Sequence, residues 1–389
     1  MTIDWHEALA EVLPKVTEWR HALHRHPEVS GKEAHTRTFI IDRLTELGIP
    51  VRLFDGLNAV MGVLENGEGG CVAIRADMDA LPVTEATGLP FASECPGVMH
   101  ACGHDMHMSF ALGSALFLST HRELWHGTVK WLFEPCEETT GGGQQMVSQG
   151  CMEDPTVACV IGQHCNPSYP VGTFIGKPGP VSGSSDELRI TIHGEGCHGA
   201  YPHRGVDAIT AAAQVISALQ LLIARNTDPF DSAVVTVGEI HGGTANNIVA
   251  DEVRMRGTLR TLNDRTKQFL RERIRQTVEQ VAAGCGARGV LEILPSYTAV
   301  TNEPGFYAMV SGEAENICGP ERMVLREYPS LGVESFCYFE DHTPGVYYDI
   351  GTGVSTALHS PTFIAEDAAL ETGVALQCAS VIRMLDALK

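Results

Sequence analysis

Runs of apolar residues, broken by polar turns, divide the first 180 residues into strands and helices. The pattern over residues 4–47 predicts two helices with a break at HRHPEVSG. Short runs rich in β-branched residues follow, with helical patterns at 105–120 and 141–150 between some of them. The predicted strands are 51–54, 58–66, 71–77, 127–134 and 156–164. Strands that alternate with helices predict an α/β sheet covered on both faces.

A second pattern begins after residues 177–185, where Pro, Gly and Ser cluster as they do in a linker. The stretch DELRITIHG alternates like a strand, and it is followed by a long helix, two strands, an amphipathic helix at 264–283 and a final strand, GVLEIL. This β-α-β-β-α-β order is the ferredoxin-like pattern. We therefore expect a large α/β domain at 1–181 and 296–389, interrupted by a smaller domain at 182–295.

The composition of the chain limits which binding partners and which cellular compartment we expect for the protein. The 389 residues carry a formal net charge of -21, which argues against nucleic acid or an anionic membrane as a partner. The first residues lack the basic and apolar segments of a signal sequence, and no apolar run is long enough to predict a membrane span. The twelve cysteines show no repeated spacing. These features predict a cytoplasmic protein with reduced thiols.

The stretch MHACGHDMHM, residues 99–108, concentrates groups that bind metals. Cys102 and His104 lie just before a helix that we expect to begin near Asp105. Thiolate and imidazole suit zinc, whereas imidazole with carboxylate also suits manganese, cobalt or nickel. The alternative is an ordinary loop in which Asp105 caps the helix.

Two further groups of candidate residues follow predicted strands. Glu137 and Glu138 come shortly after the strand VKWLF, at the end where open α/β sheets place ligands. One of two neighbouring glutamates can bind metal while the other serves as a general base, although a solvated acidic turn is the alternative. His164 ends another apolar run, and His359 lies in a loop before the last helix. Each of these histidines has a purely structural role as its alternative.

The expected small domain carries two polar loops. Glycines bracket His198 in HGEGCHGAYPHRGVDA, so the backbone there can closely approach another group, although a Gly-rich turn with exposed histidines is the alternative. The loop GGTANNIVADE is similar. Taken together across the chain, one Cys, three His and one Glu could hold two metal ions, and a second Glu could deprotonate a water. This combination predicts a two-metal hydrolase.

The chain resembles the two-metal aminoacylase and carboxypeptidase family, in its hippurate-hydrolase and auxin-conjugate amidohydrolase branch. The resemblance runs nearly from end to end. It rests on the motifs LHRHPEVSGKE, RADMDALPVTE, MHACGHDMHM, FEPCEETTGGG, GQHCNPSYPVG, GCHGAYPHRGVDA, GGTANNIVADE and ALHSPTF. The fold that it implies is a two-metal exopeptidase-like catalytic domain with an inserted ferredoxin-like lid and dimerisation domain.

The resemblance also implies the metal site. Two divalent ions, whether zinc, manganese, nickel or cobalt, would be held by Cys102, His104, Glu138, His164 and His359.

Other roles come from the same resemblance. Glu137 would be the general base that activates a water, and Asp79 would be an acid close to the metals. His198 would stabilise the oxyanion, reaching the active site of the other subunit of a dimer, and Asn247 would help to hold the substrate.

The implied reaction is hydrolysis of the amide bond of an N-acyl amino acid by a homodimer, with a tetramer as the alternative assembly. A dipeptidase or carboxypeptidase activity at the same site is one alternative. A non-catalytic metal-binding relative is another, and a hydrolase that uses the Cys102 thiol is a third. The chain departs from the family at Cys136, where Ala is common, and at Val333 and Ser335, where relatives have Ser-Glu-Asp-Phe. A further departure lies in the expected strand PSYTAVTNEP, where relatives have Tyr-Pro.

Overall fold

The computed structural model describes residues 3–389, which form two compact units. The large unit comprises the chain up to Val181, Thr301–Tyr328 and Ser335–Lys389. The second unit, called the insert below, comprises Ser182–Val300 and Pro329–Glu334. The insert therefore ends beyond residue 295, where sequence patterning placed its border, and it includes a short later segment that patterning assigned to the large domain.

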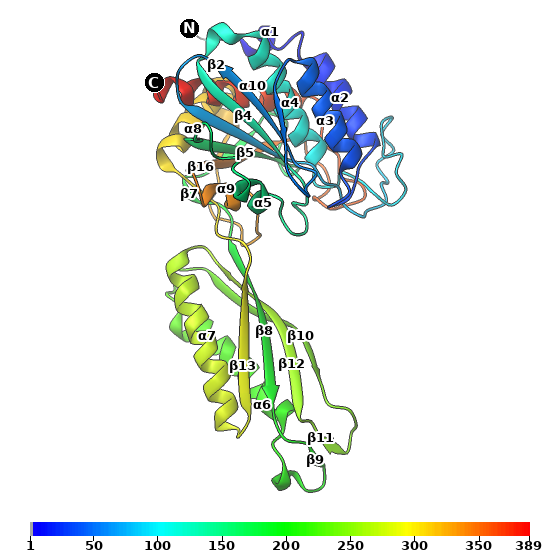
Figure 1. The fold of residues 1–389 in the computed structure, drawn as a ribbon, viewed down its shortest axis with the longest axis vertical. Helices are drawn as coiled ribbons and strands as arrows, with labels where there is room; N and C mark the ends of the chain where they lie inside the picture. Colours follow the sequence, from blue (N-terminus) through cyan, green and yellow to red (C-terminus); the bar gives the residue numbers. More distant parts are fainter. Residues whose placement is uncertain (1–2) are drawn as a thin grey trace. The chain divides into compact units, whose positions relative to one another are not determined.

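The large unit is built on a ten-stranded mixed sheet with the main order β1-β2-β4-β3-β5-β16-β14-β7, and β6 joins β15 to β16 (Figure 1). The central strands β4, β3, β5 and β16 are parallel, and three of them are buried along their whole length, as expected for a sheet covered on both faces. The strands are β1 (Val51–Leu53), β2 (Val60–Asn66), β3 (Cys71–Asp77), β4 (Gly127–Glu134), β5 (Cys159–Asn166), β6 (Phe174–Gly176), β7 (Gly179–Pro180), β14 (Thr301–Asn302), β15 (Met323–Leu325) and β16 (Gly345–Gly351).

Two of these strands differ from expectation. The stretch PSYTAVTNEP forms only the two-residue strand β14, and β7 lies inside the predicted linker.

Helices complete the large unit. Helix α4 is buried along almost its whole length, because it packs against α2, α10 and β3. The helices are α1 (Trp5–Ala8), α2 (Leu13–Arg25), α3 (Ala34–Glu46), α4 (His104–Thr120), α5 (Gly143–Ser148), α8 (Pro304–Cys318), α9 (Cys337–Glu340) and α10 (Ala369–Ala387), with 3-10 turns η1 (Arg122–Leu124) and η3 (Pro320–Arg322).

The parallel strands bring polar residues to one edge of the sheet. Asp77 at the end of β3 pairs in register with Glu134 at the end of β4, and β5 carries His164 near its own end. Parallel strands all finish at the same edge, where ligands bind in open α/β sheets. The helix that follows β3, α4, begins at His104, so the metal-binding motif lies on the connection from this edge into the helix.

The insert is a four-stranded antiparallel sheet with two helices. Its strand order is β10-β12-β8-β13, and α6 and α7 pack on each other and on the sheet. The elements are β8 (Ser184–His193), α6 (Ala208–Asn226), β10 (Ala233–Gly242), β12 (Glu252–Thr261), α7 (Asp264–Gly284) and β13 (Arg288–Pro295), with η2 (Pro202–Arg204). Along the chain this is the β-α-β-β-α-β order, and Figure 1 shows the long helix α7 running beside β13. Two short strands, β9 (Cys197–His198) and β11 (Ile248–Val249), form a separate pair.

Helix α6 is the one helix within residues 3–389 whose length and composition would allow it to cross a membrane. One face of the helix is buried in the core of the insert, through Ala208, Ala211, Ala212, Val215, Leu219 and Leu222. A core helix passes the same test of length and composition, so this feature is weak evidence for a membrane span.

Candidate active site

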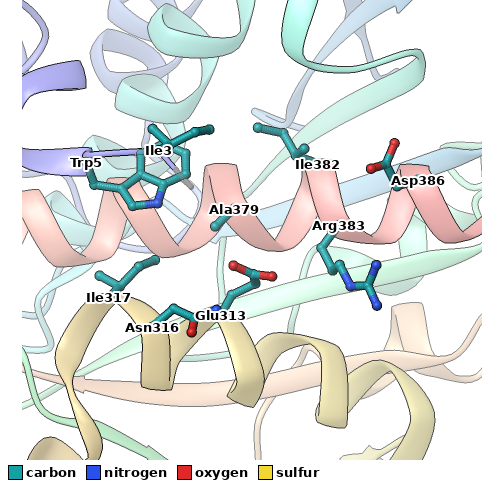
Figure 2. A pocket seen from close by; sticks show the side chains of 9 residues that line it. All are labelled: Ile3, Trp5, Glu313, Asn316, Ile317, Ala379, Ile382, Arg383 and Asp386. Carbon is teal, nitrogen blue, oxygen red and sulfur yellow. The ribbon is translucent and has the colours of Figure 1, made fainter. Parts of the chain in front are cut away.

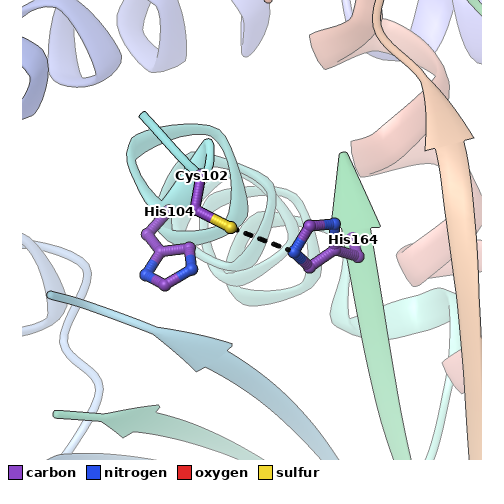
Figure 3. Close-up of side chains that lie close together, drawn as sticks. All are labelled: Cys102, His104 and His164. Carbon is purple, nitrogen blue, oxygen red and sulfur yellow. Dashed lines mark hydrogen bonds between the residues drawn. The ribbon is translucent and has the colours of Figure 1, made fainter. Parts of the chain in front are cut away.

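Cys102, His104 and His164 come together where α4 begins and β5 ends (Figure 3). The Cys102 Sγ atom lies 3.6 Å from Nε2 of His164. The other ring nitrogen of His164, Nδ1, donates a hydrogen bond to the carbonyl of Cys165 at 2.7 Å. Because a carbonyl can only accept, Nδ1 carries a proton, and Nε2 is the ring nitrogen that faces the Cys102 sulfur.

Glu138 and His359 complete the group. Oε1 of Glu138 lies 3.3 Å from Nε2 of His359 and 3.9 Å from Nε2 of His104. His359 has a φ angle of 66°, a conformation that costs energy for a residue other than glycine. Its backbone N–H donates to the carbonyl of Ala101 at 2.8 Å, which ties this loop to the Cys102 segment.

The donor set fits a pair of divalent ions. Ligand atoms of Cys102, His104 and His164 lie within 4.8 Å of one another, and so do those of Cys102, Glu138 and His359. Two buried atoms in these groups, Nδ1 of His104 and Oε1 of Glu138, have no hydrogen-bond partner among residues 3–389. Buried polar atoms without partners are uncommon in folded proteins, and thiolate, imidazole and carboxylate are the groups that bind zinc and its neighbours.

The charges of the group favour a cation. Burial by itself would raise the pKa of the Cys102 thiol, but hydrogen bonds from His104, His164 and His359 hold it well below its usual range. Burial would lower the pKa of His164, yet the same thiolate raises it to about 10. Burial and the Cys102 charge raise the pKa of Glu138 to about 7. The Cys102 thiolate is thus formed readily, and a divalent ion could take the place of the protons that His164 and Glu138 hold beside it.

The Asp79 carboxylate organises the loop of the two glutamates. Its Oδ1 accepts the backbone N–H of Glu137, and its Oδ2 accepts the N–H of Glu138, both at 3.1 Å. Oδ2 also accepts the hydroxyl of Ser30 at 2.6 Å, and Oδ1 lies 3.5 Å from Nδ1 of His104. The predicted acid near the metals therefore lies against both the candidate base and a candidate ligand.

Two neighbouring residues of the metal motif have other roles. Nε2 of His107 accepts the backbone N–H of Cys165 at 2.9 Å, so its proton lies on Nδ1, which donates to Asp77 at 2.7 Å. Both ring nitrogens are thereby occupied. Asp105 does not cap α4, because its carboxylate is buried and instead accepts hydrogen bonds from Arg20 and His24. The capping alternative was therefore wrong.

Sequence reasoning missed Arg75 and Asp77, which lie beneath this group. Arg75 is buried within β3 and donates to Asp77 and Glu134, at 2.7 Å each. The one signal in the sequence was a charged residue inside the otherwise apolar run CVAIRAD, because a buried arginine requires partners.

The structure places His198 and Asn247 close together in the insert. His198 on β9 pairs with Ile248 on β11, and the N–H of Gly199 donates to the carbonyl of Asn247 at 2.7 Å. Nδ1 of His198 accepts the N–H of Ala200 at 3.1 Å, so the proton of the neutral ring lies on Nε2. Both side chains are exposed within the insert, and the Nε2–H of His198 is available as a donor.

Comparison with known proteins places this geometry in a family. Residues 73–383 match peptidase family M20/M25/M40. The chain belongs to this family. An N-acetyl-L-cysteine deacetylase of Bacillus subtilis is 35% identical over 94% of this chain and 87% of its own length. A thermostable carboxypeptidase of Saccharolobus solfataricus is 34% identical over 95% of this chain and 96% of its own length.

Solved structures of the M20 family have the same fold. The YXEP protein of Bacillus subtilis, described as a dinuclear metal-binding peptidase, superposes with a TM-score of 0.85 at 32% identity and covers 97% of this chain and 99% of its own. These findings confirm the prediction of a metal-dependent amidohydrolase with a mixed α/β fold. Together with the donor groups around Cys102, they support two divalent ions in this M20 enzyme.

Replacing Asp79 by Asn tests the organisation of the site. An amide can accept only through its single oxygen, so one of the two glutamate N–H groups loses its partner and a charge beside His104 disappears. We expect metal affinity to fall by about 10–100-fold while the fold persists. Metal retained after dialysis measures this, with the exposed Asp42→Asn variant on α3 as the control. Retention of metal at the wild-type level by Asp79→Asn would contradict the role.

Proposed function

We propose that the chain hydrolyses the amide bond of an N-acyl amino acid, giving a carboxylic acid and a free amino acid. The observation that carries the proposal is the carboxylate of Glu137 beside His104 and Glu138, two of the side chains that could hold metal. Ligand atoms of His104, Glu137 and Glu138 lie within 4.8 Å of one another. Named deacetylases among the relatives support the reaction class. Within that class, the motif resemblance favours the hippurate-hydrolase and auxin-conjugate branch.

The residues divide into ligands and catalytic groups. Cys102, His104, Glu138, His164 and His359 would hold two divalent ions, drawn from zinc, manganese, nickel and cobalt. When bound, such ions polarise a carbonyl and acidify a water.

Two further side chains would take part in the reaction, one by transferring a proton and one by stabilising negative charge on the substrate. The Glu137 carboxylate takes a proton from the attacking water and passes it to the leaving amine. The Nε2–H of His198 donates to the carbonyl oxygen as negative charge develops there. Asn247, whose backbone is hydrogen-bonded to the His198 loop, helps to hold the substrate.

A carboxypeptidase or dipeptidase activity is the second candidate. The observation that favours it is the 34% identity to a thermostable carboxypeptidase over nearly the whole of both chains. The two activities differ in whether the acyl half of the substrate carries a free amine.

The insert supports a homodimer. At one end of its sheet, β10 has no further strand partner among residues 3–389 and exposes Val234 and Ile240. Helix α6 exposes Ile209 and Leu221. Free strand edges and exposed apolar side chains are features that proteins cover, and a second copy of the chain would do so. We place the dimer in the cytoplasm, because all twelve cysteines, each within the described part of the chain, are free thiols.

A substrate panel on metal-depleted and metal-restored protein tests the function. The panel contains N-acetyl, N-benzoyl, N-lauroyl and indole-acetyl amino acids, together with simple dipeptides. We expect no hydrolysis after chelation and recovery of N-acyl cleavage on adding zinc, manganese, cobalt or nickel. Hydrolysis that survives chelation would instead support the Cys102 thiol alternative, and cleavage of dipeptides alone would support the second candidate.

The Glu137→Gln variant tests the base. The amide keeps the shape of the side chain but cannot take up the proton, so we expect kcat to fall by about 10²–10⁴-fold with metal content unchanged. Steady-state kinetics and metal analysis measure the two quantities. A turnover number equal to that of the wild type would remove Glu137 from the mechanism.

Mixing two inactive variants tests whether His198 serves the partner subunit. His198→Ala should by itself lower kcat by about 10²–10³-fold. Mixed dimers with Glu137→Gln would contain one site that keeps both Glu137 and a partner's His198, so activity should return in part. Differently tagged chains isolate the mixed dimers. No recovery in those dimers would show that His198 is not shared.

A further inference from the structure

We propose that Ser335, anchored by Arg75, is a positioning residue for the carboxylate of Glu137. The inference rests on the proposed role of Glu137 as the base.

Arg75 is the fixed point of this arrangement. Arg75 is 3% exposed, and its guanidinium donates from three nitrogens: Nε to Glu134, Nη1 to Asp77 and Nη2 to the Ser335 hydroxyl, each at 2.7 Å. A guanidinium is a rigid planar fork, so three bonds in three directions leave it no alternative orientation. Two of its partners are themselves held in place, because Glu134 accepts the N–H of Gly143 and Asp77 accepts a hydrogen bond from His107.

Ser335 connects the fixed Arg75 side chain to Glu137. Its side chain is fully buried, with its hydroxyl fixed by Arg75, and its carbonyl accepts the N–H of Tyr338 at the start of α9. Its backbone N–H points at Oε1 of Glu137 from 3.5 Å, a long contact that a small closing movement would turn into a full hydrogen bond. The Asp79 carboxylate fixes the backbone of Glu137, and the Ser335 N–H adds a contact to the carboxylate of its side chain.

A neutral residue suits this position. Arg75 already faces two carboxylates, those of Asp77 and Glu134. An acid at 335 would add negative charge next to Glu137, whereas a hydroxyl accepts a hydrogen bond from Nη2 of Arg75 without adding charge. Ser335 is also the first residue of the large unit after Pro329–Glu334, which belongs to the insert. The Arg75 anchor therefore fixes the point at which the chain returns to the active-site unit.

The Ser335→Ala variant removes the anchor without adding volume. We expect kcat on the best substrate of the wild-type enzyme to fall by about 10–100-fold, with KM changed by less than about twofold. The matched control is Ser114→Ala, a fully buried serine on α4 whose hydroxyl accepts the Trp131 N–H, far along the helix from His104. That variant should lose thermal stability yet keep kcat. Equal loss of kcat in both variants would show a general structural effect and overturn the inference.

A double-mutant cycle separates positioning of Glu137 from other effects. If Ser335 acts through Glu137, then Ser335→Ala should change the residual kcat of Glu137→Gln by less than about twofold. Independent, multiplying losses would overturn the proposal, as would an unchanged kcat in Ser335→Ala alone.

Failure of the proposed function would be visible separately, as a wild-type enzyme that cleaves none of the substrates. Crystal structures of the wild type and Ser335→Ala then decide the inference. A Glu137 carboxylate that moves in the variant supports it, and one that stays in place overturns it.

Discussion

The carboxylate of Asp79 is the interaction on which the site depends. Its two oxygens accept the backbone N–H groups of Glu137 and Glu138, and one of them also accepts the Ser30 hydroxyl. On an extended chain the side chains of adjacent residues point to opposite sides. Glu137 and Glu138 can therefore serve the same site in different roles only if the turn between them is fixed. A buried acceptor for both N–H groups fixes that turn, and its charge lies against His104 at the same time.

Two residues near the site have strained backbone conformations that hydrogen bonds to neighbouring segments hold in place. Cys136 adopts a φ angle of 63° just before the glutamates, and His359 adopts 66° in its own loop. Such conformations persist only where surrounding contacts enforce them. Glu33 accepts the N–H of Cys136, and Ala101 accepts that of His359, so each strained residue is tied to a neighbouring segment. The edge of the sheet thus determines where the candidate site residues lie, and hydrogen bonds determine how their side chains are oriented.

Much of this could be predicted from sequence, because the relevant signals are local. Each buried parallel strand and the Cys102 motif lie within a few consecutive residues, and the insert is recognised from the order of such local elements along the chain. The partners of Arg75 could not be predicted, because Asp77, Glu134 and Ser335 are brought together only by strand pairing and by the return of the chain after the insert. The role of Asp105 could not be predicted either, because its partners lie on α2, which is distant in sequence.

Two ions are expected to bind among the side chains grouped around Cys102. Anomalous diffraction from crystals loaded with zinc or manganese tests it most directly, because it locates metals without reference to activity. We expect two peaks per chain, one beside His164 and one beside His359. A single peak, or a peak between Asp77 and His107 with none at His359, would contradict it.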